Sequence, residues 1–160
     1  WDVSYVSEKF KHNLYKIDDE ALRPYFPETQ VLNGLFKIIE ILYDIEIKEV
    51  KTDNIWHENV RYFELYQLKN KERIGAIYTD LYARETKRSG AWMDSCHIRH
   101  RFTNGILQLP IAYVICNFTP SDKSYGSLLT HDEVQTLFHE FGHALHHLLP
   151  NISHVHYLKI

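Results

Sequence analysis

Three residues near the end of the chain combine the side chains needed for metal-assisted hydrolysis. The stretch H-E-F-G-H places His139 and His143 four positions apart, with Glu140 directly after the first histidine. On an α-helix, residues i and i+4 are neighbours about 6 Å apart, so two imidazole nitrogens can reach one zinc ion at about 2 Å each. Glu140 is then placed to act on a metal-bound water rather than to bind the metal. The spacing predicts His139 and His143 as zinc ligands and Glu140 as the general base.

The residues around this motif predict one long helix from Thr130 to Leu149. Thr130 followed by Glu133 is typical of a capping box, and Pro150 favours a stop. Apolar residues at helical spacing form a stripe opposite the two histidines: Val134, Leu137, Phe141, Leu145 and Leu148. Gly142 costs about 1 kcal/mol inside a helix, which is reasonable if another group packs closely between the histidines. We therefore expect one helix face in a core and one face carrying imidazoles.

A zinc site of this kind needs a third protein ligand, and no Asp or Glu follows Glu140. His146 is about 10 Å along a straight helix from His139, too far for one zinc ion, and His147 has the same difficulty. His154 or His156 could fold back after the helix and complete the site. The expectation for all four later histidines is that they are solvated.

The chain before this helix predicts an α+β arrangement. We expect helices over residues 4–15 and 29–45, the second with a stripe formed by Val31, Leu32, Leu35, Ile38, Ile39 and Leu42. Alternating or β-branched segments predict strands over residues 45–51, 60–68 and 73–83, with a hairpin at K-N-K-E. Residues 83–94 and 119–127 are expected to be loops, with Trp92, Met93 and Asp94 as packing and turn residues. The apolar run 109–118 predicts a strand, either interior and buried on both faces or lying along a cleft, where a peptide could pair with it.

The composition of the chain argues against several classes of protein function. The chain has 160 residues, 44% hydrophobic and 24% charged, which suits one ordinary globular domain. A net charge of -3 without a basic stripe argues against nucleic-acid binding. No apolar run approaches the roughly 20 residues that span a bilayer. Cys96 and Cys116 are too few for a disulfide scaffold, so we expect free buried thiols in a reducing compartment, with a redox or metal role as the alternative.

Several segments together resemble the thimet oligopeptidase and oligopeptidase A family of zinc metallopeptidases. T-H-D-E-V-Q-T-L-F-H-E-F-G-H-A-L-H-H-L-L resembles the active-site helix of that family, and S-G-A-W-M-D-S-C resembles its G-G-A-W-M-D-x-C segment. L-P-I-A-Y-V-I-C-N-F resembles the strand that leads to the helix. W-D-V-S-Y-V-S-E-K, A-L-R-P-Y-F-P and V-L-N-G-L-F-K-I resemble the start of the catalytic region. The likeness runs from Trp1 to about Leu149.

The resemblance implies a zinc-dependent endopeptidase that cuts short peptides in a deep channel between two largely helical halves. His139 and His143 match the first two zinc ligands, Glu140 matches the general acid/base, and one Zn²⁺ is expected per intact site. The resemblance also gives Trp92, Met93 and Asp94 an alternative role, as support for the zinc helix. The family's third ligand is a glutamate on a following helix, about two dozen residues beyond the second histidine. Residues 1–160 are therefore expected to be a partial, mainly helical zincin-type catalytic domain, truncated before the third ligand and inactive alone, with a small sheet before the zinc helix.

Two other interpretations remain open at this stage. The chain could be a truncated, inactive member of the family, or a histidine-rich metal-binding or interaction module. Cytoplasm is the expected compartment, with an organelle such as the mitochondrion as the alternative. The sequence indicates short peptides as partners, with no nucleic acid and no membrane, and it does not indicate an oligomeric state.

Overall fold

The computed structural model describes Val6, residues 19–120 and residues 127–150. The helix expected over residues 4–15 lies outside this part, apart from Val6. The described chain begins with α2 (Asp19–Leu22), the 3₁₀ helix η1 (Arg23–Tyr25) and α3 (Glu28–Tyr43). Strands β1 (Ile45–Glu49), β2 (Arg61–Gln67), β3 (Arg73–Tyr82) and β4 (Trp92–His97) follow. A short hairpin of β5 (His100–Arg101) and β6 (Leu107–Gln108) precedes β7 (Ile111–Phe118) and α4 (His131–Leu148).

Five of the strands form one mixed sheet in the order β1-β2-β3-β7-β4. All neighbours are antiparallel except β3 and β7, which run parallel. The expected hairpin joins β2 and β3, and the α+β class is confirmed. The sheet is larger than the small sheet that the sequence predicted, so the described part of the chain is not mainly helical as expected, and the β5–β6 hairpin was not expected. Within the described residues, β1 and β4 are the edge strands.

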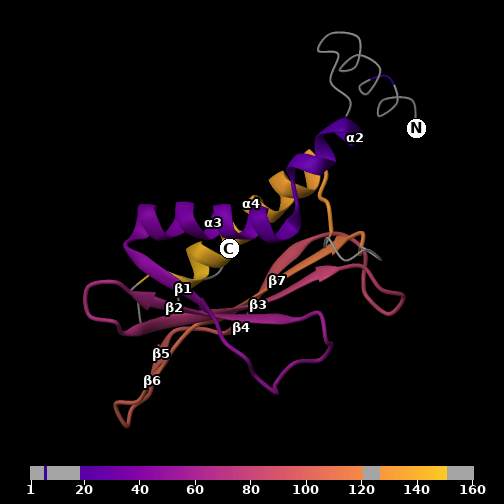
Figure 1. Cartoon of the computed structure of the whole chain (residues 1–160). Coiled ribbons are helices and arrows are strands. Elements are labelled where there is room, and N and C mark those ends of the chain that lie inside the picture. Colours follow the sequence, from indigo (N-terminus) through magenta and orange to yellow (C-terminus); the bar gives the residue numbers. More distant parts are fainter. Residues whose placement is uncertain (1–5, 7–18, 121–126, 151–160) are drawn as a thin grey trace.

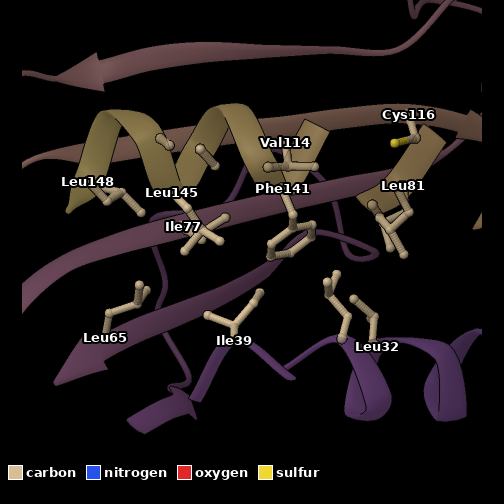
Figure 2. Packing of buried hydrophobic residues seen from close by; sticks show 14 of the residues in the cluster. Leu32, Ile39, Leu65, Ile77, Leu81, Val114, Cys116, Phe141, Leu145 and Leu148 are labelled. Carbon is tan, nitrogen blue, oxygen red and sulfur yellow. The ribbon is translucent and has the colours of Figure 1, made fainter. Parts of the chain in front are cut away.

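Helices α3 and α4 pack on the same face of this sheet (Figure 1). Phe141 points from α4 toward Leu32 and Ile39 of α3 (Figure 2), and its ring centroid lies 5.7 Å from that of Phe36. The sheet contributes fully buried residues to this cluster, such as Leu65, Ile77 and Val114. This apolar layer holds α4 against the sheet. Among the described residues, no helix is both long enough and apolar enough to cross a membrane.

Three expectations about packing were wrong in part. Ile38 and Leu42 of α3 are 48% and 69% exposed, because the helix meets the core along a narrower stripe than its apolar residues suggested. Strand β7 is fully buried on the face toward the helices, whereas Tyr113 and Asn117 on the other face are only half-buried. β7 also lies inside the sheet between β3 and β4, so no peptide can pair with it.

The segment Trp92–Asp94 was expected in a loop but forms the start of edge strand β4. The turn before it is held by Asn117, whose side-chain nitrogen donates to the carbonyls of Arg88 and Gly90 at 2.8 and 2.6 Å. Strand β4 then pairs with β7, with Trp92 opposite Ile115 and a register irregularity between Ser95 and His97. Ladder pairing with β7 therefore determines the structure of this segment.

A buried ion cluster anchors the same turn to the end of β3. The Asp80 side chain is 2% exposed and pairs with Arg84 at 2.7 Å and with Lys87 at 3.0 Å. Trp56, from the loop between β1 and β2, donates its indole N–H to Asp80 at 2.9 Å. Lys87 also donates to the carbonyls of Asp80 and Tyr82. The cluster thus links three chain segments and fixes where β4 begins.

Candidate metal centre on α4

Helix α4 forms as the sequence predicted, and hydrogen bonds satisfy backbone groups at its N-terminus. The Thr130 hydroxyl accepts from the Glu133 amide at 3.1 Å, and the Glu133 carboxylate accepts from the Thr130 amide at 2.8 Å. This capping box satisfies backbone groups that a helix start leaves without partners. Of the predicted apolar stripe, Leu137, Phe141, Leu145 and Leu148 are buried and Val134 is half-buried. The stripe fixes the rotation of α4 and turns His139 and His143 outward.

His139 and His143 converge as a pair of metal ligands would. Both side chains are exposed, and their Nε2 atoms lie 3.1 Å apart. Two nitrogens bound to one tetrahedral zinc ion at about 2 Å each would lie about 3.3 Å apart. The two rings are nearly perpendicular, with an interplanar angle of 86°. The two nitrogens therefore converge. Their separation is compatible with one shared zinc ion and equally with a hydrogen bond between two neutral imidazoles.

Glu140 is buried against the sheet rather than exposed beside the histidines. Its residue exposure is 8%, whereas His139 before it is exposed. Burial, and after it the charge of nearby Glu140, raises the pKa of the Cys116 thiol on β7 to about 12. Because α4 packs on β7 and Glu140 is buried, Glu140 lies on the flank of α4 between the exposed histidine pair and the sheet.

The later histidines do not behave alike, contrary to the expectation that all are solvated. His146 is exposed, but His147 is buried, and its Nε2 lies 2.8 Å from the His97 carbonyl oxygen. His147 follows Glu140 by seven residues, or about 20° short of two full turns, so the two share one helix flank. No sequence signal indicated this burial, because the partner of His147 lies 50 residues earlier in the chain. His154 and His156 lie outside the described residues.

A third metal ligand is not present in the part of the chain that the structure describes. No three His, Cys, Asp or Glu side chains are grouped there closely enough to hold a metal ion. The close packing expected at Gly142 is also not observed, because a Cβ added to this residue would meet nothing within 4 Å. The surface beside the histidine pair is therefore open in this structure.

The other residues weighed from the sequence have structural roles. Trp92 and Met93 are half-buried in β4, and Asp94 accepts from the Ser95 amide at 2.8 Å. In the described structure none of these three side chains makes a hydrogen bond to His139 or His143. Both cysteines are free, as expected, but only Cys116 is fully buried, and Cys96 accepts from the Tyr113 hydroxyl at 3.0 Å.

Comparison with known proteins shows to which family the chain belongs. The profile of Peptidase family M3 matches residues 1–159. Oligopeptidase A of Escherichia coli is 55% identical over 153 residues, covering 96% of this chain and 22% of the relative. The organellar oligopeptidase A of Arabidopsis thaliana, named as chloroplastic/mitochondrial, is 38% identical over 93% of this chain and 19% of its own length. A probable cytosolic oligopeptidase A from the same plant is 37% identical over 93% of this chain and 22% of its own length.

The chain belongs to Peptidase family M3, the family of the thimet oligopeptidases and oligopeptidase A. The resemblance read from the sequence is therefore confirmed, and the family is one of peptidases. The chain spans about a fifth of the length of the relatives it matches. The relatives' names include both cytosolic and organellar proteins.

Proposed function

We propose that residues 1–160 form part of the catalytic domain of a zinc-dependent oligopeptidase of the zincin type. The observation that carries this proposal is the convergence of the His139 and His143 Nε2 atoms to 3.1 Å on the exposed side of α4. Membership of a peptidase family supports the reaction class. The third ligand is proposed to come from residues outside 1–160, as the family resemblance implies.

In this proposal the Nε2 atoms of His139 and His143 would hold one zinc ion. When bound there, zinc would supply Lewis-acid polarisation of a water molecule and of the scissile carbonyl. Glu140 accepts a proton from the attacking water as the new C–O bond forms, and it returns that proton to the amine as the C–N bond breaks. The position of Glu140, between the histidine pair and the sheet, suits a base that reaches the reacting atoms without binding the metal.

Strand β4 replaces β7 as the proposed binding edge for the peptide backbone. It packs beside α4 and is an edge strand of the described sheet, so its outward backbone groups are available for pairing. An extended peptide added to such an edge gains main-chain hydrogen bonds independently of its side chains. This mode suits an enzyme that accepts many short peptides.

The test uses the full-length protein and a quenched fluorescent peptide. We expect cleavage that a chelator abolishes and added Zn²⁺ restores, and we expect His143→Ala to lose both zinc and cleavage. Gln135→Ala, on an exposed position of the same helix, is the matched control and should keep both. Zinc binding without cleavage would instead support the inactive member or the metal-binding module, and cleavage that survives full metal removal would refute the proposal.

A further inference from the structure

The last turn of α4 makes a polar contact with the edge strand that the proposed reaction does not explain. His147 is 9% exposed, and its Nε2 lies 2.8 Å from the carbonyl oxygen of His97, the last residue of β4. A carbonyl only accepts, so Nε2 carries the proton and donates it. Within the described residues, this is the side-chain hydrogen bond that joins α4 to β4.

We propose that His147 is a positioning residue that fixes α4, and with it the His139–His143 pair, at a set position relative to edge strand β4. The inference rests on the proposed function, in which the pair binds zinc and β4 binds the peptide backbone. His147 itself touches neither the metal nor the substrate in this account. It acts through the two elements that its hydrogen bond joins.

Apolar packing alone leaves the position of α4 along the sheet weakly defined. The buried face of the helix meets the sheet through Leu137, Ala144, Leu145 and Leu148, and hydrophobic contacts are not directional. A hydrogen bond weakens steeply with distance and angle. The apolar stripe fixes the rotation of the helix, and a single bond of this kind, one turn beyond His143, opposes sliding of the helix along the sheet.

The His147–His97 hydrogen bond lies close to the residues of the proposed catalytic site. His147 lies one turn, or about 6 Å, beyond His143, and it shares the flank of α4 that carries Glu140. A shift at His147 would thus move the base and the ligand pair together relative to β4. A displacement of about 1 Å between a catalytic group and its substrate can cost about 10²-fold in rate.

The end of β4 depends on the same bond. The pairing of β4 with β7 is irregular between Ser95 and His97, so the ladder defines this end less strongly than a regular one. The His97 carbonyl gains a partner from α4 instead. Losing that partner should loosen the carboxyl end of β4 as well as the helix contact.

The test compares two replacements at one position in the full-length protein. His147→Gln keeps an N–H donor at about the same reach as Nε2, whereas His147→Leu keeps bulk and burial but removes the donor. For each variant we measure zinc content, the melting temperature and hydrogen–deuterium exchange over residues 92–98. We also measure kcat and KM for a long peptide that can pair along β4 and for a short peptide that spans only the cleaved bond.

We expect both variants to fold and to bind zinc. His147→Leu should show faster exchange over residues 92–98 and at least a 10-fold lower kcat for the long peptide, with a smaller loss for the short one. His147→Gln should stay within about 3-fold of the natural protein. Unchanged exchange and kinetics in His147→Leu would overturn the inference. Equal losses in both variants, equal losses for both peptides, or loss of zinc in His147→Leu would overturn it too.

The exchange measurement separates this inference from the proposed function. If residues 92–98 loosen in His147→Leu and not in His147→Gln while the natural protein cuts no peptide, the contact positions β4 but the proposed function fails. If the natural protein cuts peptides and exchange does not change, the proposed function stands and the role of His147 is wrong.

Discussion

Replacing Asp80 by asparagine should destabilise the protein by about 3 kcal/mol at pH 7. The Asp80 carboxylate accepts two hydrogen bonds from Arg84, at 2.8 and 2.7 Å, and one from Lys87 at 3.0 Å. The side chains of Asp80 and Lys87 are only 2% and 4% exposed. Asparagine keeps the shape but removes the charge, so Lys87 would remain buried without a counter-ion. Breaking a buried ion pair from one side costs about 3–5 kcal/mol.

The destabilisation should shrink in acid. Burial raises the pKa of Asp80, but hydrogen bonds from Arg84, Trp56 and Lys87 outweigh burial and lower that pKa from 3.8 to about 2. Because the folded-state pKa lies below the unfolded value, ionised Asp80 stabilises the fold above about pH 4, and this contribution is lost as the pH falls toward 2. At about 1.4 kcal/mol per pKa unit, the pH-dependent part is about 2 kcal/mol.

Urea unfolding of the full-length protein at several pH values, followed by circular dichroism, measures this difference. Asp53→Asn is the matched control, because Asp53 is an exposed carboxylate in the loop before Trp56. The control should stay within about 0.5 kcal/mol of the natural protein at every pH. An Asp80→Asn variant as stable as the control at pH 7, or a difference that widens as the pH falls from 4 to 2, would refute the reasoning.

Two further predictions concern Cys116 and the isolated chain. The pKa of Cys116 is raised to about 12 by burial and by the charge of Glu140, so an alkylating reagent at pH 8 should label this thiol only after unfolding; rapid native labelling in mass spectrometry would contradict this. Residues 1–160 alone should bind zinc much more weakly than the full-length protein and cut no peptide, because His139 and His143 supply only two protein ligands. One tightly bound zinc per isolated chain in calorimetry would show that His154, His156 or a second copy completes the site.

The sequence predicted those parts of the fold that depend on local chemistry. Helix α4 was placed correctly because Thr130, Glu133 and the apolar stripe all act within a few residues of one another. Strands β1 and β2 followed from alternation, β3 followed from its β-branched and aromatic residues, and the β2–β3 hairpin followed from the K-N-K-E turn. The convergence of His139 and His143 required only the four-residue period of a helix.

The parts that depend on distant segments could not be predicted in this way. Trp92–Asp94 looked like a loop because Gly90 and charged residues precede it, and only pairing with β7 makes it a strand. The burial of His147 depends on the His97 carbonyl, 50 residues earlier. Asp80 pairs with Arg84 and Lys87 nearby in the chain, but the third group on its carboxylate, the Trp56 indole, comes from a loop 24 residues earlier. In each case a partner from a distant segment completes the arrangement.

The zinc content and turnover of Glu140→Gln in the full-length protein test the central claim most directly. Glutamine keeps the shape of the side chain but cannot accept the proton, and a general base contributes roughly 10²–10⁴-fold to the rate. We predict one zinc ion per chain, as in the natural protein, with kcat lowered at least 100-fold. Glu85→Gln, at an exposed position, should retain full turnover. A Glu140→Gln variant that binds zinc and keeps more than about a tenth of the natural kcat would show that Glu140 is not the base.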